Sequence, residues 1–239
     1  MSDSLLTVAS QLAQQNPPDP DLAEQAVATS PSICFDQLLN SLVEKQWFVA
    51  ENYLPAALCE RLAAELKQLN AAQRLSPAGI GRGTEHHQAE QIRSDFTHWL
   101  KGDTPVQREF LSIMRELKDT LNRELFLGLF EYECHYAFYP PGSFYQKHYD
   151  AFRGRSNRVV TTVLYLNPNW EAAHEGQMRV YHPETGAALL DVPPRSGTLV
   201  CFLSEKVAHE VLPTQADRLS IAGWFRINNS LQGLVDPPR

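Results

Sequence analysis

The second half of the chain, from residue 126 onward, alternates short β-type segments with turn residues, and this pattern constrains the fold more than any other feature. Segments rich in β-branched, aromatic and apolar residues predict strands at 131–139, 159–166, 177–181, 198–202 and 219–225. Turn-forming sequences lie between or beside them: PPG, NPN, HPETG and PPRSG. Several short strands at this spacing predict a mainly β fold, a sandwich or a jelly-roll barrel of the cupin type, which is a double-stranded β-helix.

The first half has a mainly helical pattern, which makes the whole chain α+β. Apolar residues recur at helical spacing over 34–43 and 105–121, and a leucine stripe follows Pro55 at Leu58, Leu62, Leu66 and Leu69. Proline is well tolerated in a first helical turn, so a helix is expected to begin next to Pro55. Residues 47–54 predict a strand and a turn. Because each helix carries one apolar face, we expect these helices to support the sheet from outside.

The length of the chain indicates its domain organisation. With 239 residues, 43% of them hydrophobic, it can bury one substantial core. We expect a single domain over residues 31–239, with the jelly-roll core at about 128–228. Residues 1–30 hold a short amphipathic stretch and a proline-bearing connector, which predict an N-terminal arm.

Charge and cysteine usage exclude several classes of partner. Acidic residues outnumber basic ones, 28 to 21, and the formal net charge of −7 argues against nucleic acid or an anionic membrane as a partner. No apolar stretch reaches roughly 18 residues and no signal-peptide pattern opens the chain. The four cysteines are widely separated and form no disulfide framework. The expectation is a soluble cytoplasmic protein with reduced thiols.

A glycine-bearing segment at 75–90 interrupts the helical half. Gly79, Gly81 and Gly83 alternate with small or polar residues, and neither a strand-to-helix context nor a GK[ST] sequence accompanies them. A phosphate-binding loop is therefore not expected. A mobile functional loop and an ordinary surface loop both remain open.

A candidate metal site is carried by His148 and Asp150, the only His-x-Asp or His-x-Glu sequence in the chain. On an extended segment, positions i and i+2 point to the same face, so both side chains can converge on one ion. Two imidazoles and one carboxylate leave open positions on a non-haem Fe(II). The best candidate for the third ligand is His209, 59 residues after Asp150, in the turn that follows an apolar strand. Taken alone, such a dyad is weak evidence, because a lone histidine is more often a hydrogen-bonded surface or core residue.

A candidate anion site lies nine positions after His209, at Arg218. The planar guanidinium binds a carboxylate through two parallel hydrogen bonds, and a buried arginine in a barrel suits a dicarboxylic cosubstrate such as 2-oxoglutarate. The hydroxyl of Tyr165 can add a hydrogen bond to the same carboxylate. The alternatives are a surface ion pair between Arg218 and Asp217, and a core role for Tyr165.

Four motifs in order resemble the prolyl hydroxylases related to the hypoxia-inducible-factor hydroxylases, including their bacterial relatives. They are IRSDFTHW (92–99), FYPPGSFYQKHYD (138–150), RVVTTVLYLNPNW (158–170) and AHEVLPTQADRLSIAGWF (208–225). The resemblance covers about residues 75–225. Collagen-type hydroxylases carry lysine where Arg218 stands, and nucleic-acid demethylating relatives differ in arginine spacing. No zinc-finger sequence precedes the catalytic part, which favours a bacterial or stand-alone member.

The resemblance implies a role for each matching residue. His148, Asp150 and His209 become the iron ligands, and Arg218 becomes the anchor for 2-oxoglutarate with Tyr165 as its partner. Tyr139 matches a tyrosine beside the cosubstrate, although the loop after it is one residue shorter here. Four further residues match positions around the substrate entrance of the family: Arg93, Asp95, Trp99 and Arg158. The alternative is that they form an ion-pair network that only holds the loop in place. The segment 75–90 falls where the family has its substrate-covering loop.

The implied activity is a peptidyl-prolyl 4-hydroxylase, a dioxygenase that uses Fe(II), 2-oxoglutarate and O2, with ascorbate as a supporting reductant and succinate and CO2 as co-products. Its partner would be a protein with an exposed proline, in bacteria a translation elongation factor. Two alternatives remain: a small-molecule or free amino-acid hydroxylase with the same iron site, and a non-catalytic metal-binding jelly roll. A scaffold has no need of a cosubstrate anchor, so Arg218 argues against the last.

Overall fold

The computed structural model describes residues 33–79, 91–151 and 157–228. The predicted arm at 1–30 and most of the glycine-bearing segment lie outside these residues. Strands dominate the described part, as the turn-separated segments predicted. No helix in it is long and apolar enough to cross a membrane. All four cysteines are free, and Cys34 is the exposed one.

Two antiparallel sheets form the core. The larger has seven strands in the order β1-β9-β6-β11-β4-β3-β2, and the smaller has four in the order β5-β10-β7-β8. The strands of the larger sheet are β1 (Trp47–Ala50), β2 (Ser76–Pro77), β3 (Phe96–Trp99), β4 (Glu131–Tyr139), β6 (Arg158–Tyr165), β9 (Leu199–Leu203) and β11 (Arg218–Arg226). Those of the smaller are β5 (Tyr145–His148), β7 (Met178–Tyr181), β8 (Ala188–Val192) and β10 (His209–Val211). This arrangement confirms the double-stranded β-helix.

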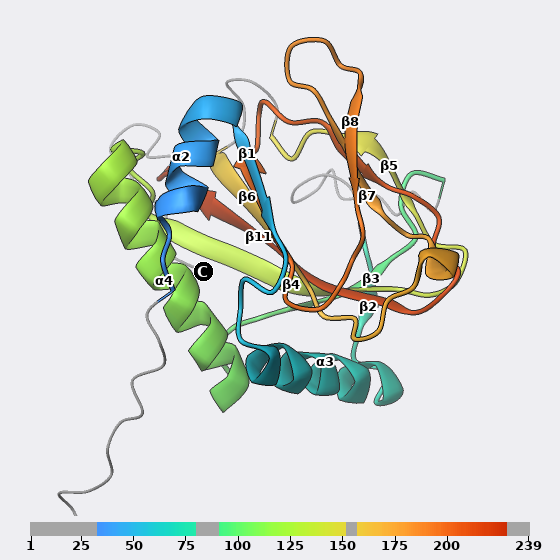
Figure 1. Cartoon of the computed structure of the whole chain (residues 1–239). Coiled ribbons are helices and arrows are strands. Elements are labelled where there is room, and N and C mark those ends of the chain that lie inside the picture. The colour runs from blue at the N-terminus through green and yellow to red at the C-terminus, as the bar shows by residue number, and fades with distance from the viewer. Residues whose placement is uncertain (1–32, 80–90, 152–156, 229–239) are drawn as a thin grey trace, which may run out of the picture. The chain divides into compact units, whose positions relative to one another are not determined.

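Three helices pack beside the larger sheet, and the smaller sheet lies on its other side (Figure 1). They are α2 (Asp36–Lys45), α3 (Ala56–Ala71) and α4 (Pro105–Leu125). The Thr104 hydroxyl accepts from the Gln107 backbone N–H at 3.3 Å, and Pro105 follows at the first helical position, so α4 begins with a cap. The leucine stripe of α3 is buried, as its spacing predicted.

Strand β4 shows how one segment serves two sides of the large sheet. His135, Ala137 and Tyr139 line the space between the sheets. Tyr136 points the other way, and its hydroxyl donates to Glu65 Oε2 of α3 at 2.6 Å. Successive side chains of a strand alternate between faces, so one set of β4 residues packs on the helices while the other faces the cleft. Strand β11 repeats this pattern, with Arg218, Ser220, Ala222 and Trp224 facing the cleft.

The sequence pattern did not predict several of the short strands. Strands β3, β5, β8 and β10 were not predicted, and β5 reads YQKH, which has no apolar alternation. The placement of His209 in a turn was wrong, because His209 opens β10 and pairs with His148 on one side and Val180 on the other.

Candidate active site

A cleft between the two sheets has a volume of about 1420 Å³. Small-ligand pockets typically measure about 300–1,000 Å³, so this cleft has room for more than one small molecule. Side chains from both sheets line it, together with Pro77, Ala78 and Gly79 just before the undescribed part of the glycine-bearing segment. Residues 80–90 of that segment lie outside the described residues, so its covering role stays a prediction.

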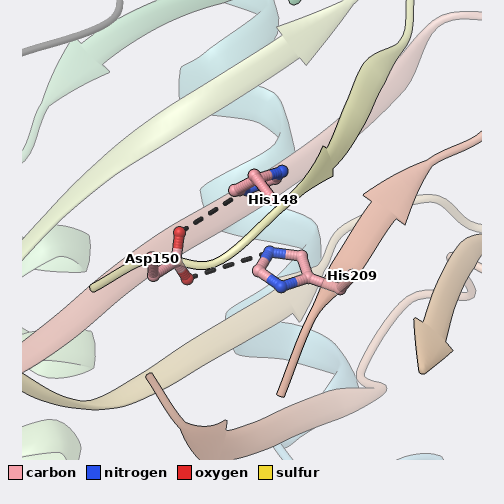
Figure 2. A group of neighbouring side chains, drawn as sticks. All are labelled: His148, Asp150 and His209. Atoms are coloured by element: carbon pink, nitrogen blue, oxygen red, sulfur yellow. Dashed lines mark ion pairs between the residues drawn. The ribbon is translucent and has the colours of Figure 1, made fainter. Parts of the chain in front are cut away.

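His148, Asp150 and His209 meet at one wall of this cleft (Figure 2). Strands β5 and β10 pair with His148 and His209 directly opposite each other, and Asp150 follows two residues after His148. One ligand atom from each side chain lies within 4.8 Å of the others. The Asp150 carboxylate is 3.6 Å from His148 Nε2 and 3.8 Å from His209 Nε2. The three residues form the only such cluster among the described residues.

Hydrogen bonds orient these three side chains. His148 Nδ1 is 2.7 Å from the Gln146 carbonyl, and His209 Nδ1 is 3.4 Å from the Val207 carbonyl. A carbonyl only accepts, so each Nδ1 carries the proton and each Nε2 keeps a lone pair. The Thr161 hydroxyl donates to Asp150 Oδ2 at 2.8 Å.

The protonation states also suit a metal. Burial and, to a smaller extent, His148 lower the pKa of His209 to about 4, so this imidazole is neutral at neutral pH. Burial alone would raise the pKa of Asp150, but His209 and His148 outweigh it and hold that pKa far below its usual range. Two neutral imidazoles and a carboxylate are the donor set of a non-haem Fe(II) site.

Aromatic rings pack against the two histidines. The ring of Tyr145 stacks on His148 at 3.6 Å between centroids, and the guanidinium of Arg93 lies 4.4 Å from the Tyr145 centroid. Phe202 packs against His209 at 4.7 Å. No sequence pattern singles out Tyr145 or Thr161. Tyr145 reaches His148 within the smaller sheet, and Thr161 reaches Asp150 from β6 of the larger sheet.

Arg218 also lines the cleft and is only 1% exposed. Its Nε donates to the Gly176 carbonyl at 2.9 Å, while Nη2 is buried without a hydrogen-bond partner in the described part of the chain. Because Arg218 is buried and forms no ion pair with the described residue Asp217, the surface-pair alternative is wrong. A buried cation with an unused N–H fits an incoming carboxylate.

Two tyrosines flank Arg218. Its Cζ lies 4.9 Å from the Tyr139 ring and 5.0 Å from the Tyr165 ring. The Tyr165 hydroxyl contacts Met178 Sδ at 3.1 Å, a weak acceptor. Burial raises the pKa of Tyr165 to about 12 although Arg218 opposes this, so the hydroxyl keeps its proton and can donate to a carboxylate.

Three of the four residues matched to the substrate entrance take part in two ion pairs, and Glu133 completes the second pair. Arg93 donates to both oxygens of Asp95, at 2.7 and 2.6 Å, and Asp95 is buried. Arg158 donates to Glu133 Oε1 at 3.1 and 2.9 Å and lies 3.6 Å from the Trp224 ring centroid. Both arginines and the half-exposed Trp99 line the cleft, whereas Asp95 does not. The geometry therefore accommodates both the substrate role and the ion-pair role.

Residues 134–226 match the 2OG-Fe(II) oxygenase superfamily. The match includes the His148, Asp150 and His209 cluster and Arg218. The hypoxia-inducible factor prolyl hydroxylase of Caenorhabditis elegans is 27% identical over 201 residues, which are 80% of this chain and 28% of that protein. The chain thus spans about a quarter of that relative's length.

Two solved structures resemble this chain in both fold and sequence. A Pseudomonas putida prolyl-4-hydroxylase is 39% identical, with a TM-score of 0.74, over 82% of this chain and 100% of that one. A Trichoplax adhaerens prolyl hydroxylase, solved with a peptide fragment of the hypoxia inducible factor oxygen degradation domain, is 26% identical. Its TM-score is 0.71, over 79% of this chain and 86% of that one.

Proposed function

Because this chain belongs to the prolyl hydroxylases of the 2OG-Fe(II) oxygenase superfamily, we propose that it hydroxylates C4 of a prolyl residue in a protein. His148, Asp150 and His209 would hold Fe(II). Arg218 and Tyr165 would bind the distal carboxylate of 2-oxoglutarate, with Tyr139 packed beside it. Bound iron, 2-oxoglutarate and O2 supply the oxidising chemistry, which yields succinate, CO2 and the hydroxylated product.

One observation carries the proposal. The candidate metal ligands His148, Asp150 and His209 line the same cleft as the buried Arg218, whose Nη2 has no hydrogen-bond partner among the described residues. A metal-binding scaffold would gain nothing from Arg218, since burying a cation without a carboxylate is costly. The fixed hydrogen bonds of His148, His209 and Asp150 orient the donor atoms before any ligand arrives. The protein thereby supplies positioning.

The size of the cleft favours a protein substrate over a free amino acid. Its volume of about 1420 Å³ exceeds what 2-oxoglutarate and one free amino acid need. Arg93, Trp99 and Arg158 line it and would contact the segment that flanks the target proline, while Asp95 holds Arg93 in place. The peptide complex of the Trichoplax relative supports this choice.

The proposed partner is a bacterial protein with an exposed proline, and a translation elongation factor is our candidate. The cytoplasm is the proposed compartment, because it keeps free thiols such as those of the four cysteines reduced. We also propose residues 31–239 as one catalytic domain.

A lysate experiment tests the substrate class. The protein is incubated with Fe(II), 2-oxoglutarate, ascorbate and a bacterial lysate, and peptides are then sequenced by mass spectrometry. We expect one oxygen atom added to a specific proline, and no such product with Asp150→Ala. Hydroxylation of free proline or another metabolite, with no modified protein, would instead establish the small-molecule alternative.

Gly176 tests how Arg218 is positioned. Its φ is +67°, and a Cβ there would lie 2.8 Å from Thr214 and 3.3 Å from Arg218 Cδ. Gly176→Ala should therefore displace Arg218 and weaken 2-oxoglutarate binding by about tenfold, a loss of roughly one hydrogen bond to a charged group. Calorimetric titration measures this affinity.

Gly186→Ala is the matched control. Gly186 has the same φ of +67°, but no atom lies within 4 Å of a Cβ built there. Both alanine variants incur the cost of a left-handed alanine, about 1–2 kcal/mol, while only Gly176→Ala disturbs Arg218. Equal 2-oxoglutarate affinities in the two variants would contradict the positioning role of Gly176.

A further inference from the structure

His135 lies on the cleft face of β4 and belongs neither to the candidate metal site nor to the pair of tyrosines around Arg218. It is 5% exposed and lines the cleft, directly opposite Trp99 of β3 and Ala222 of β11. No sequence motif singles it out. A buried polar side chain that faces a binding cleft needs a partner, so the chemistry of its ring indicates what the cleft accepts.

The ring of His135 packs against two tryptophans, which also contact each other at 6.4 Å between centroids. Its centroid is 5.2 Å from that of Trp99, in an edge-on arrangement, and 5.4 Å from that of Trp224. Arg158 covers Trp224 at 3.6 Å. The rings of Trp99, His135 and Trp224 thus form one aromatic group at the cleft, and His135 contributes a polar ring nitrogen to it.

The hydrogen bond of Nδ1 fixes the tautomer. His135 Nδ1 is 3.0 Å from the Tyr136 carbonyl, which only accepts, so Nδ1 carries the proton. Burial and, to a smaller extent, the nearby Arg93 lower the pKa of His135 to about 4, so the ring is neutral at neutral pH. Nε2 is then a lone-pair acceptor, and none of the described residues donates a hydrogen bond to it.

2-Oxoglutarate cannot satisfy this acceptor. Both of its carboxylates and its ketone accept hydrogen bonds and donate none when ionised. Its proposed anchor Arg218 pairs with Tyr139, four residues along β4 from His135, which corresponds to about 13 Å of strand. Neither the described residues nor 2-oxoglutarate donates to Nε2, which leaves this acceptor to the other substrate.

We propose that His135 is a specificity-determining residue that accepts a hydrogen bond from a backbone N–H next to the target proline. This inference rests on the proposed function and deepens it. Proline has no backbone N–H, so the donors nearest to it in a polypeptide are the amides of its neighbours. A contact to one of these amides would set the register of the peptide, whatever its side chains, and would bring one particular proline to the metal.

A backbone methylation scan tests the contact through binding and not through turnover. The probe is an arrayed library of capped heptapeptides with proline at the centre, titrated by fluorescence anisotropy onto full-length protein with Zn(II) and 2-oxoglutarate. In the tightest binder, each amide N–H is then replaced in turn by N-methyl. We expect methylation at one position to weaken binding to the wild type by about tenfold, because Nε2 is left unpaired.

Two variants of His135 separate the effect of losing the hydrogen-bond acceptor from the effect of changing the shape of the side chain. His135→Leu should bind the parent peptide about tenfold more weakly and should be nearly insensitive to methylation at that one amide. His135→Gln keeps an acceptor and should recover part of the affinity and of the sensitivity. Calorimetric titration of 2-oxoglutarate shows whether the rest of the cleft is intact in each variant.

The outcomes are distinct. If methylation costs the same in wild type and His135→Leu at every position, the proposed contact is wrong while the peptide substrate stands. If no proline peptide binds but free proline does, both the peptide substrate and this inference fall. Nitrogen NMR of histidine-labelled protein supplies an independent check, because a proton found on Nε2 of His135 would make it a donor and overturn the proposal.

Discussion

Asp150→Ala is expected to abolish hydroxylation and to weaken Fe(II) binding by at least about 100-fold. Loss of a residue that merely orients a metal ligand typically costs about 10–100-fold in affinity, and Asp150 would be a ligand itself. Removing it also takes away the one carboxylate of this cluster. Anaerobic titration with Fe(II) measures the affinity, and 2-oxoglutarate consumption measures the activity.

Two further variants calibrate this result. Thr161→Val removes the hydroxyl that donates to Asp150 and should cost about 10–100-fold in metal affinity. Asp191→Ala removes a surface carboxylate that pairs with Arg179, and should leave iron binding unchanged. If Asp150→Ala bound Fe(II) as tightly as Asp191→Ala does, the metal assignment would have to be dropped.

Arg218→Ala is expected to raise the 2-oxoglutarate requirement at least tenfold while leaving iron binding mostly intact. Loss of one partner of a buried charge pair typically costs about 2–5 kcal/mol, and each 1.4 kcal/mol is about tenfold. Arg218→Lys keeps the charge but loses the planar fork, so its affinity should fall between wild type and Arg218→Ala. Calorimetry with 2-oxoglutarate provides the measurement.

Arg195→Ala is the control for charge alone. Arg195 is half-exposed and forms a surface pair with Glu51, so its removal changes the net charge by the same amount without touching the cleft. Its 2-oxoglutarate affinity should match the wild type. An Arg218→Ala variant with the same affinity as Arg195→Ala would refute the anchor.

The parts of the site that the sequence predicts are those whose chemistry is unusual for their setting. Few kinds of site other than an iron and 2-oxoglutarate site combine a His-x-Asp pair on an extended segment with a distant histidine and an arginine that follows it closely. His209 was selected by its spacing, and the structure brings it opposite His148. Long strands such as β4 and β11 also carry enough periodicity to be recognised.

The remaining features depend on pairing between segments far apart in sequence. Strand β5 is extended because β10 pairs with it, not because of its own residues. Tyr145, Thr161 and His135 are ordinary strand residues by type, and their importance comes from the neighbours that the two sheets give them. The described residues stop on either side of 80–90, so the loop expected there stays a prediction.

Alternate residues of β4 face the cleft and the helices, and this limits which sequence changes the strand can accept during evolution. His135, Ala137 and Tyr139 face the cleft, while Tyr136 between them is bonded to α3. Inserting or deleting one residue in β4 would exchange the two sets, sending the helix-packing residues into the cleft and the cleft residues into the core. Mutational drift within this strand is thus restricted to substitutions at alternate positions. Insertions and deletions are tolerated only in the loops, so lineages should differ in loop length and keep the strand length constant.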